Sequence, residues 1–461
     1  MRLAEMQHLR QGIPIYAPAT PERFDAAIYG PLYYLSGSRL VDPNHPAYFP
    51  LRVLAAFGTL GAAAVSGLLA FGLGRKVLAA VLAPLIVLSY GFVSFYGTSN
   101  RADSLALCLS VAGVLIAHHF RASGKILLSA PVFLIAFFYK QQFVAAPLAL
   151  LTFLMLEKRY RTAAVFAGSM IAGGLGLLAL FQFVVFSGQD FFRHFYSYNL
   201  LPFSVTHFKG GMVVFAVLFV VPCLVAWEFV RVHGEKFFAC YLPAAVIVAL
   251  LAVGKEGSDT NYFLETILIL AALFAALLAE RIAQPAPAIE LLALLAVTLF
   301  AGQFFAPPAP QPSDFERDRA IQDYLRKNHP PRTRALGYYA GDLVRAGLAA
   351  PISDLYQYTQ LTRFGTFSED EMLNQLRRRS FQVIILPFDL IAAKDQSCLN
   401  RSLTDGMRRT ILEAYQLAET LELPGPEQSH AEDRFYAWVP RPTEGSATPD
   451  APAPARAGDM R

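Results

Sequence analysis

The residues best suited to chemistry are ionisable and amide side chains that border long apolar stretches. Lys140 and Gln141 separate two such stretches, while Arg101 and Asp103 stand at the start of another. A charged side chain at membrane depth is costly unless it is paired or faces a wet cavity, so each is a functional candidate. Cations at a membrane edge suit a lipid phosphate, because charge and donors must meet the anion at the interface. An ordinary exposed ion pair is the alternative for Arg101 and Asp103.

A second polar group begins at Lys255 and runs into the next apolar stretch. Gly257 permits a tight turn there, and Tyr262 supplies an aromatic ring. Asn261 and Glu265 lie one helical turn apart and would share one face of a helix. Glu265 lies inside an apolar stretch, so of all the candidates it is the hardest to explain as a residue without a function. The alternative is an acid that reaches the membrane rim or closes a structural hydrogen bond.

Two further candidates precede the first apolar stretch. Glu5 is expected on a short helix that Gly12 and Pro14 end, and a carboxylate there can accept a proton from a hydroxyl group. A solvated surface acid is the alternative. Tyr33 and Tyr34 belong to an aromatic turn that either forms a wall for a sugar ring or anchors the chain at the headgroup level.

No metal or cofactor site is predicted. The histidines show no convincing metal-ligand spacing, and a P-loop, a GxSxG elbow and a dinucleotide fingerprint are all missing from the sequence. The cysteines predict neither a disulfide framework nor a CxxC site, since they are scattered over Cys108, Cys223, Cys240 and Cys398.

The elements that must position these residues are membrane helices. The 461-residue chain is 55% hydrophobic and only 16% charged, whereas a soluble domain carries about 25% charged residues. The composition therefore argues against a purely soluble enzyme. The net charge of +4 lacks the dense basic surface of a nucleic-acid-binding protein. Because a helix needs about 20 apolar residues to cross the hydrocarbon core, we predict spans near 52–73, 78–97, 103–120, 126–139, 142–156, 162–186, 212–230, 237–254, 262–280 and 288–306.

The loops between these spans set the orientation, because short cytoplasmic loops are enriched in Lys and Arg. Alternate loops carry such residues, namely Arg75 and Lys76, Arg121 and Lys125, Lys158, Arg159 and Arg161, Arg231 and Lys236, and Arg281. The candidate residues all fall on the opposite side and predict one extracytoplasmic cleft. The short fourth and fifth spans could instead form a re-entrant pair. Residues 1–50 must then lie outside, so we expect that a preceding first transmembrane helix is lacking from this chain.

The last third of the chain changes in composition. Residues 307–440 predict a small extracytoplasmic α/β domain, with strands at Arg334–Tyr339, Phe381–Pro387 and Arg434–Pro440 and helices at Ser313–Asn328, Ser368–Arg379 and Leu403–Glu419. A polyproline exit from the bilayer precedes it. Residues 441–461 predict a disordered tail. The fold class is thus an all-α polytopic membrane protein with three further parts: a juxtamembrane segment at 1–50, the α/β domain and the tail.

Several short motifs resemble the polytopic GT-C glycosyltransferases, particularly the Rgt-type and protein O-mannosyltransferase-like enzymes. The motifs are the segment from Glu5 to Tyr16, Tyr29-Gly-Pro-Leu-Tyr-Tyr34, Arg101-Ala-Asp103, Lys140-Gln141 and Asn261-Tyr-Phe-Leu-Glu265. The resemblance implies an enzyme in the bacterial inner membrane. It would transfer a sugar from a polyprenyl-phosphate-linked donor to an extracytoplasmic glycan, lipid or protein. In that family an acid in the first outer loop is the catalytic base, and Glu5 matches its position, although Asp is more usual.

The expected mechanism is an inverting displacement in which Glu5 deprotonates the acceptor. Lys140, Arg101 and Lys255 would bind the departing phosphate, and the substrate-binding residues would be Asp103, Gln141, Asn261, Tyr262, Glu265, Tyr33 and Tyr34. A lipid or saccharide transporter and an inactive scaffold with this fold are the alternatives.

Overall fold

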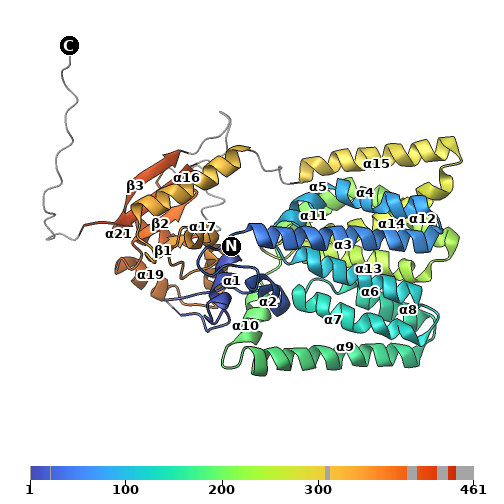
Figure 1. The fold of residues 1–461 in the computed structure, drawn as a ribbon, viewed down its shortest axis with the longest axis horizontal. Coiled ribbons are helices and arrows are strands. Elements are labelled where there is room, and N and C mark those ends of the chain that lie inside the picture. The colour runs from blue at the N-terminus through green and yellow to red at the C-terminus, as the bar shows by residue number, and fades with distance from the viewer. Residues whose placement is uncertain (1, 21, 307–311, 392–401, 423–433, 443–461) are drawn as a thin grey trace, which may run out of the picture.

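The computed structural model describes residues 2–20, 22–306, 312–391, 402–422 and 434–442. Apolar helices form a bundle at one end of the long axis and a mixed sheet with short helices forms the other end (Figure 1). The bundle comprises α3 (Phe49–Gly74), α4 (Val77–Ser89), α5 (Gly91–Thr98), α6 (Asp103–His119), α7 (Ser129–Tyr139), α8 (Ala145–Leu156), α9 (Tyr160–Leu180), α11 (Val205–Leu218), α12 (Val220–His233), α13 (Lys236–Val253), α14 (Leu264–Arg281) and α15 (Pro285–Phe305).

Each predicted span falls on one of these helices or on a bent pair of them. Among the described residues, five helices are long and apolar enough to cross a membrane alone, and counting each bent pair as one span gives up to seven. The remaining predicted spans correspond to apolar helices of 10–17 residues, around α6, α7 and α8. The chain is therefore a polytopic helical membrane protein, with fewer full-length helices than the ten predicted.

The two bent pairs break where the helical hydrogen bonding is interrupted. α4 and α5 meet at 74° around Tyr90, whose backbone is extended. α11 and α12 meet at 60°, and Pro222 in the first turn of α12 cannot donate the backbone hydrogen bond that would continue α11.

α14 is the central helix of the bundle. It is 89% buried along its most apolar window, whereas the corresponding windows of α9 and α15 are 11% and 17% buried. These two helices lie on opposite outer sides in Figure 1. Their exposed apolar side chains suit contact with lipid, and include Ile171, Leu175, Phe300 and Phe304.

The sheet has the strand order β1-β2-β4-β3. β1 (Ala335–Gly337) pairs parallel with β2 (Val383–Leu386), and β4 (Arg434–Pro440) pairs antiparallel with β2 and β3 (Tyr415–Glu422). Its helices are α16 (Pro312–Asn328), α17 (Ala340–Arg345), α18 (Leu355–Arg363), α19 (Asp370–Arg377) and α21 (Asp405–Ala414). The predicted polyproline exit and tail lie almost wholly outside the described residues.

Two local predictions were wrong. The stretch 415–419 is the start of β3 instead of the end of a helix, because its pairing with the distant β4 overrides local helical preference. The aromatic turn before the first span is a helix, α2 (Pro31–Ser38), which begins with Pro31 at a position that suits proline.

The amino-terminal segment lies between the bundle and the sheet region (Figure 1). α1 (Leu3–Arg10) packs on α2 and α17, and Gly12 beyond its end has a φ of 75°. A backbone bridge joins Phe24 to Ile352, with the Phe24 N–H donating to Pro351 and the Ser353 N–H donating to Phe24. Segments far apart in the sequence therefore share two buried cores at this junction.

Candidate functional site

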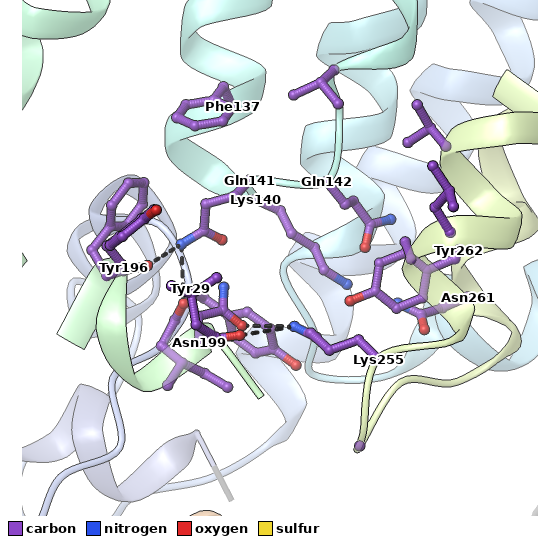
Figure 2. Close-up of a pocket in the computed structure, with 18 of the residues that line it drawn as sticks. Tyr29, Phe137, Lys140, Gln141, Gln142, Tyr196, Asn199, Lys255, Asn261 and Tyr262 are labelled. Atoms are coloured by element: carbon purple, nitrogen blue, oxygen red, sulfur yellow. Dashed lines mark hydrogen bonds between the residues drawn. The ribbon is translucent and has the colours of Figure 1, made fainter. Parts of the chain in front are cut away.

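A cavity of about 590 Å³ opens at the end of the bundle that faces the sheet region. Arg101 precedes α6, Lys140 follows α7 and Lys255 follows α13, so these cations come from three helix ends. Asn261 and Tyr262 belong to the short 3-10 helix before α14. Figure 2 shows Lys140, Lys255 and Tyr262 around the same space.

Asp103 is the carboxylate that holds the inner part of this site. It is the first residue of α6, where the helix dipole favours an acid, and it is fully buried. Its Oδ1 accepts hydrogen bonds from Lys140 Nζ and from Asn261 Nδ2, the latter at 2.7 Å. Arg101 Nε lies 3.9 Å from the other oxygen. One carboxylate thus orients two cations and an amide.

Lys140 is also enclosed by aromatic rings. Its Nζ lies 5.4 Å from the ring centroid of Tyr29 and 5.6 Å from that of Tyr262. Such contacts stabilise an ammonium group, more strongly where water is excluded. Lys140 is only 5% exposed, so its charge is held at a defined point of the wall.

Lys255 differs from the other cations because its partner is neutral. Its Nζ donates to the side-chain and main-chain oxygens of Asn199, at 2.9 and 3.3 Å, a contact drawn in Figure 2. It forms no ion pair in the part of the chain that the structure describes. Burial and repulsion from Lys140 lower the pKa of Lys255 to about 8. This ammonium group is therefore available to an anionic ligand.

The rest of the cavity wall is mostly apolar. It is formed by Phe137, Val144, Phe195, Leu200, Val248, Leu251 and Ala252. A cavity with three cations at one end and this apolar lining fits an amphiphile with an anionic head.

A second cavity of about 400 Å³ adjoins the first and shares several of its residues, namely Ile28, Tyr29, Arg101, Asn199, Lys255 and Gly257. It extends to the sheet region, where its wall is formed by Asp354, Tyr356 and Gln357. Glu256 and Asp259 add carboxylates from the loop after α13. The second cavity is thus lined by polar groups that suit a hydroxylated ligand.

The structure brings together most of the predicted site residues. The first cavity is lined by Arg101, Lys140, Gln141, Lys255, Asn261 and Tyr262, and Asp103 lies directly behind Lys140 and Asn261. Gln141 binds the backbone, donating to Ile28 and Phe195. Besides Asp103, four predicted residues line neither cavity: Glu5, Tyr33, Tyr34 and Glu265.

Glu5 lies in a buried ion-pair cluster beside the second cavity. Its Oε1 accepts from Arg2 at 2.9 Å and from the Ser353 hydroxyl at 3.1 Å, and Arg2 also pairs with Asp354 at 3.2 Å. Burial, opposed by Arg2, raises the pKa of Glu5. The alternative of a solvated surface acid is therefore wrong, because Glu5 is fully buried where α1 contacts the sheet region. The role of Glu5 as a base stays a prediction.

Glu265 lies deeper in the bundle than expected. Its Oε1 accepts from Ser110 at 3.1 Å and from Tyr241 at 2.7 Å. These partners belong to α6 and α13, so the acid on α14 joins three helices. The geometry corresponds to the structural alternative considered for Glu265.

Tyr33 and Tyr34 turn away from the cavities because α2 is helical. The Tyr33 hydroxyl donates to the side chain and the backbone of Asn100, at 2.9 and 3.1 Å. Tyr34 is buried with its ring edge-on to Tyr16. Their contribution to a sugar pocket is not supported by these contacts.

Two residues of the site were missed by the sequence prediction. Tyr29 begins the motif that contains Tyr33 and Tyr34, so a signal was present. Asn199 lies in the 3-10 helix Ser197–Asn199, inside a loop without apolar periodicity, and gave no usable signal. Among the described residues no group of three or more His, Cys, Asp and Glu could hold a metal ion. The prediction that no cofactor is needed stays a prediction.

Comparison with known proteins identifies structures of similar fold but no related sequence family. No family model matches the chain, and no curated protein matches it. The crystal structure of ArnT from Cupriavidus metallidurans bound to undecaprenyl phosphate is similar, with a TM-score of 0.54, 13% identity and coverage of 94% of this chain and 92% of that chain. The apo structure of ArnT gives a TM-score of 0.53, also with 13% identity, covering 95% of this chain and 92% of that chain. The chain therefore has the polytopic fold seen in these ArnT structures.

Proposed function

We propose that this protein is an integral-membrane glycosyltransferase that moves a sugar from a polyprenyl-phosphate-linked donor to an extracytoplasmic glycan, lipid or protein. The observation that carries the proposal is the first cavity, in which Arg101, Lys140 and Lys255 meet an apolar wall. The likeness to ArnT, whose structure contains undecaprenyl phosphate, supports this class of donor. The protein would act in a bacterial inner membrane, with the sheet region on the extracytoplasmic side as the loop charges predict.

The donor would lie with its phosphate at the three cations and its lipid chain along the apolar wall. When the bond between sugar and phosphate breaks, negative charge develops on the phosphate oxygens. Cations that are already positioned stabilise that charge without reorganisation. Asp103 keeps Lys140 in place, while Lys255 pairs with no acid among the described residues, so that none competes with the phosphate. Positioning and charge stabilisation would thus supply most of the rate acceleration.

The acceptor would approach through the second cavity. The two cavities share the wall formed by Tyr29, Arg101 and Lys255, so an acceptor hydroxyl and a donor phosphate could meet across it. Asn261 and Tyr262 line the donor side and are placed to contact the sugar. In this arrangement the acceptor attacks from the sheet side while the phosphate leaves toward the bundle, which fits inversion at the anomeric carbon.

The proposal is tested by lipid binding and product analysis. We expect full-length protein in nanodiscs to bind undecaprenyl phosphate, and Lys255→Gln to weaken binding by about tenfold or more, as expected for the loss of a charged hydrogen bond. Arg231→Gln is the matched control, because Arg231 is an exposed cation on α12. Labelled undecaprenyl-phosphate hexoses in native membranes should yield a glycosylated product. Equal binding by both variants, or lipid movement without glycan transfer, would overturn the proposal.

A further inference from the structure

Ser353 connects the sheet region to Glu5. It lies just before α18, and both residues are fully buried. The Ser353 hydroxyl oxygen lies 3.1 Å from Glu5 Oε1 and accepts the backbone N–H of Ala26 at 3.0 Å. The backbone N–H of Ser353 donates to the carbonyl of Phe24 at 2.9 Å. Ser353 is therefore fixed against the amino-terminal segment by its main chain and by its side chain.

The direction of the hydrogen bond between Ser353 and Glu5 follows from the second partner of the hydroxyl group. A hydroxyl group has one hydrogen and two lone pairs. The Ala26 N–H can only donate, so its bond with Ser353 uses a lone pair and leaves the hydrogen for Glu5. Ser353 thus donates to Oε1, the same oxygen that accepts from Arg2 at 2.9 Å.

The other oxygen of Glu5 is unpaired. Oε2 is buried and has no hydrogen-bond partner within the described parts of the chain. A buried polar atom without a partner is costly, and such atoms gather at sites where a ligand supplies the missing bond. Because Oε1 already accepts two hydrogen bonds, Oε2 is the oxygen that is free to take up a proton.

Glu5 lies one side chain behind the wall of the second cavity. Arg2 and Asp354 both line this cavity. Arg2 pairs with Glu5 at 2.9 Å and with Asp354 at 3.2 Å. The guanidinium group therefore stands between Glu5 and a ligand in the cavity, and it keeps an acidic partner if it moves away from Glu5.

We propose, on the basis of the function inferred above, that Ser353 is a positioning residue whose hydroxyl group holds Glu5 Oε1, so that Oε2 takes the proton from the acceptor hydroxyl. Arg2 moves toward Asp354 as the acceptor enters. The electrons of the broken O–H bond form the new bond to the anomeric carbon. The bond between that carbon and the phosphate oxygen breaks, and its electron pair leaves with the polyprenyl phosphate. The sheet region thereby orients the base that the amino-terminal segment carries.

The surroundings of Glu5 determine how its titration can be measured. Burial raises the pKa of Glu5, Arg2 opposes this rise, and Asp25 adds to it. The neighbouring tyrosines stay neutral in the acid range, because burial raises the pKa of each. The titratable groups around Glu5 and Arg2 come from α1, the segment after it, α2 and the sheet region, namely Arg2, Tyr16, Asp25, Tyr33, Tyr34 and Asp354.

The test compares Ser353→Ala with wild type in full-length protein. Loss of a donor to a carboxylate raises the pKa of that carboxylate, so the acid limb of the transfer rate should move up by about one pH unit. The rate is measured with labelled undecaprenyl-phosphate hexoses in native membranes, from about pH 4 to about pH 9. At saturating donor the plateau rate should fall about tenfold or more, while KM for the donor stays within about twofold of wild type.

Three further variants separate positioning from folding. Ser353→Thr keeps the hydroxyl group and should restore the wild-type pH profile. Ser353→Cys keeps the size of the side chain but donates weakly, so it should move the acid limb in the same direction as Ser353→Ala even where the alanine variant is unstable. Thr359→Val is the matched control, because it removes another fully buried hydroxyl of the sheet region, which donates to Ser402 at 2.8 Å. It should lower thermal stability without moving the pH profile.

Infrared difference spectroscopy between acid and neutral pH follows Glu5 without any transfer reaction. The carboxyl band that disappears in Glu5→Gln belongs to Glu5, and its titration midpoint should rise in Ser353→Ala but not in Thr359→Val. An unchanged midpoint in Ser353→Ala, or wild-type transfer by Glu5→Gln, would overturn the proposal. Absence of transfer in wild type would instead overturn the proposed function, while the infrared midpoint still reports the contact between Ser353 and Glu5.

Discussion

Lys255 is a cation of the first cavity whose pKa is lowered toward neutral pH. Its pKa is lowered to about 8 by burial and by Lys140, so the ammonium form predominates below that pH and is lost above it. Affinity for undecaprenyl phosphate should therefore fall as the pH rises through about 8, with a somewhat higher midpoint at saturating lipid because a bound anion favours the charged form. The measurement is a series of binding isotherms in nanodiscs between pH 6 and pH 10, a range of about two units on each side.

Lys255→Arg separates this effect from other titrations. An arginine stays charged over the whole range, so its affinity should change little with pH. If Lys255→Arg shows the same fall as wild type, the titrating group is another residue and the depressed pKa of Lys255 does not control binding.

At the residue scale, the sequence predicted site residues correctly where a charged side chain borders an apolar stretch. Arg101, Lys140 and Lys255 could be identified because the cost of a charge at membrane depth is general and local. The direction of Tyr33 was not predictable, because it depends on whether the preceding segment is a turn or a helix. Asn199 became a site residue only through the path of a long loop, which no spacing rule describes.

At the scale of elements, Glu265 is expected to stabilise the bundle. Glu265→Ala would leave the buried hydroxyls of Ser110 and Tyr241 without their acceptor, at a cost of about 1–3 kcal/mol for each unsatisfied group. Glu265→Gln keeps an amide oxygen that can accept both bonds. Thermal unfolding in detergent should therefore rank wild type close to Glu265→Gln, with Glu265→Ala clearly lower.

Activity provides the control for this assignment. If Glu265→Gln folds like wild type and still transfers sugar, the acid has a structural role. A Glu265→Ala variant of undiminished stability that no longer transfers would instead return Glu265 to the substrate-binding residues.

The existence of the elements was more predictable than their limits. Apolar length located every helix of the bundle, because burial in lipid requires it. The bends after α4 and α11 were not predicted, since hydropathy averages over a break of one residue. In the sheet region the buried strand β2 was evident from its composition, whereas β3 depends on pairing with β4 and was read as helix.

At the scale of the whole molecule, the amino-terminal segment joins the bundle to the sheet region. Arg2 is the centre of this junction, because it pairs with Glu5 on its own helix and with Asp354 before α18. Arg2 and Asp354 are more than 300 positions apart in the sequence, so no local pattern could predict that they form a pair. The second cavity exists only because this junction brings Asp354 close to the end of α13.

Asp354→Asn should loosen the junction without unfolding α18. The Asp354 side chain accepts from the Gln357 N–H at 2.9 Å and so caps α18, a role that asparagine fills equally well. The lost charge weakens the contact with Arg2, but Arg2 retains Glu5, so the cost should stay below the roughly 3–5 kcal/mol of a fully orphaned buried charge. Hydrogen exchange should accelerate in α1 and α18 and stay unchanged in the central helix α14.

Two comparisons decide whether the ion pair itself is responsible. Asp354→Ala removes the cap as well and should cost about 1 kcal/mol more, whereas Glu228→Gln breaks an exposed pair on α12 and should change nothing measurable. Unchanged exchange of α1 in Asp354→Asn would show that the apolar core around Leu3 and Leu343 holds the two parts together without the charges.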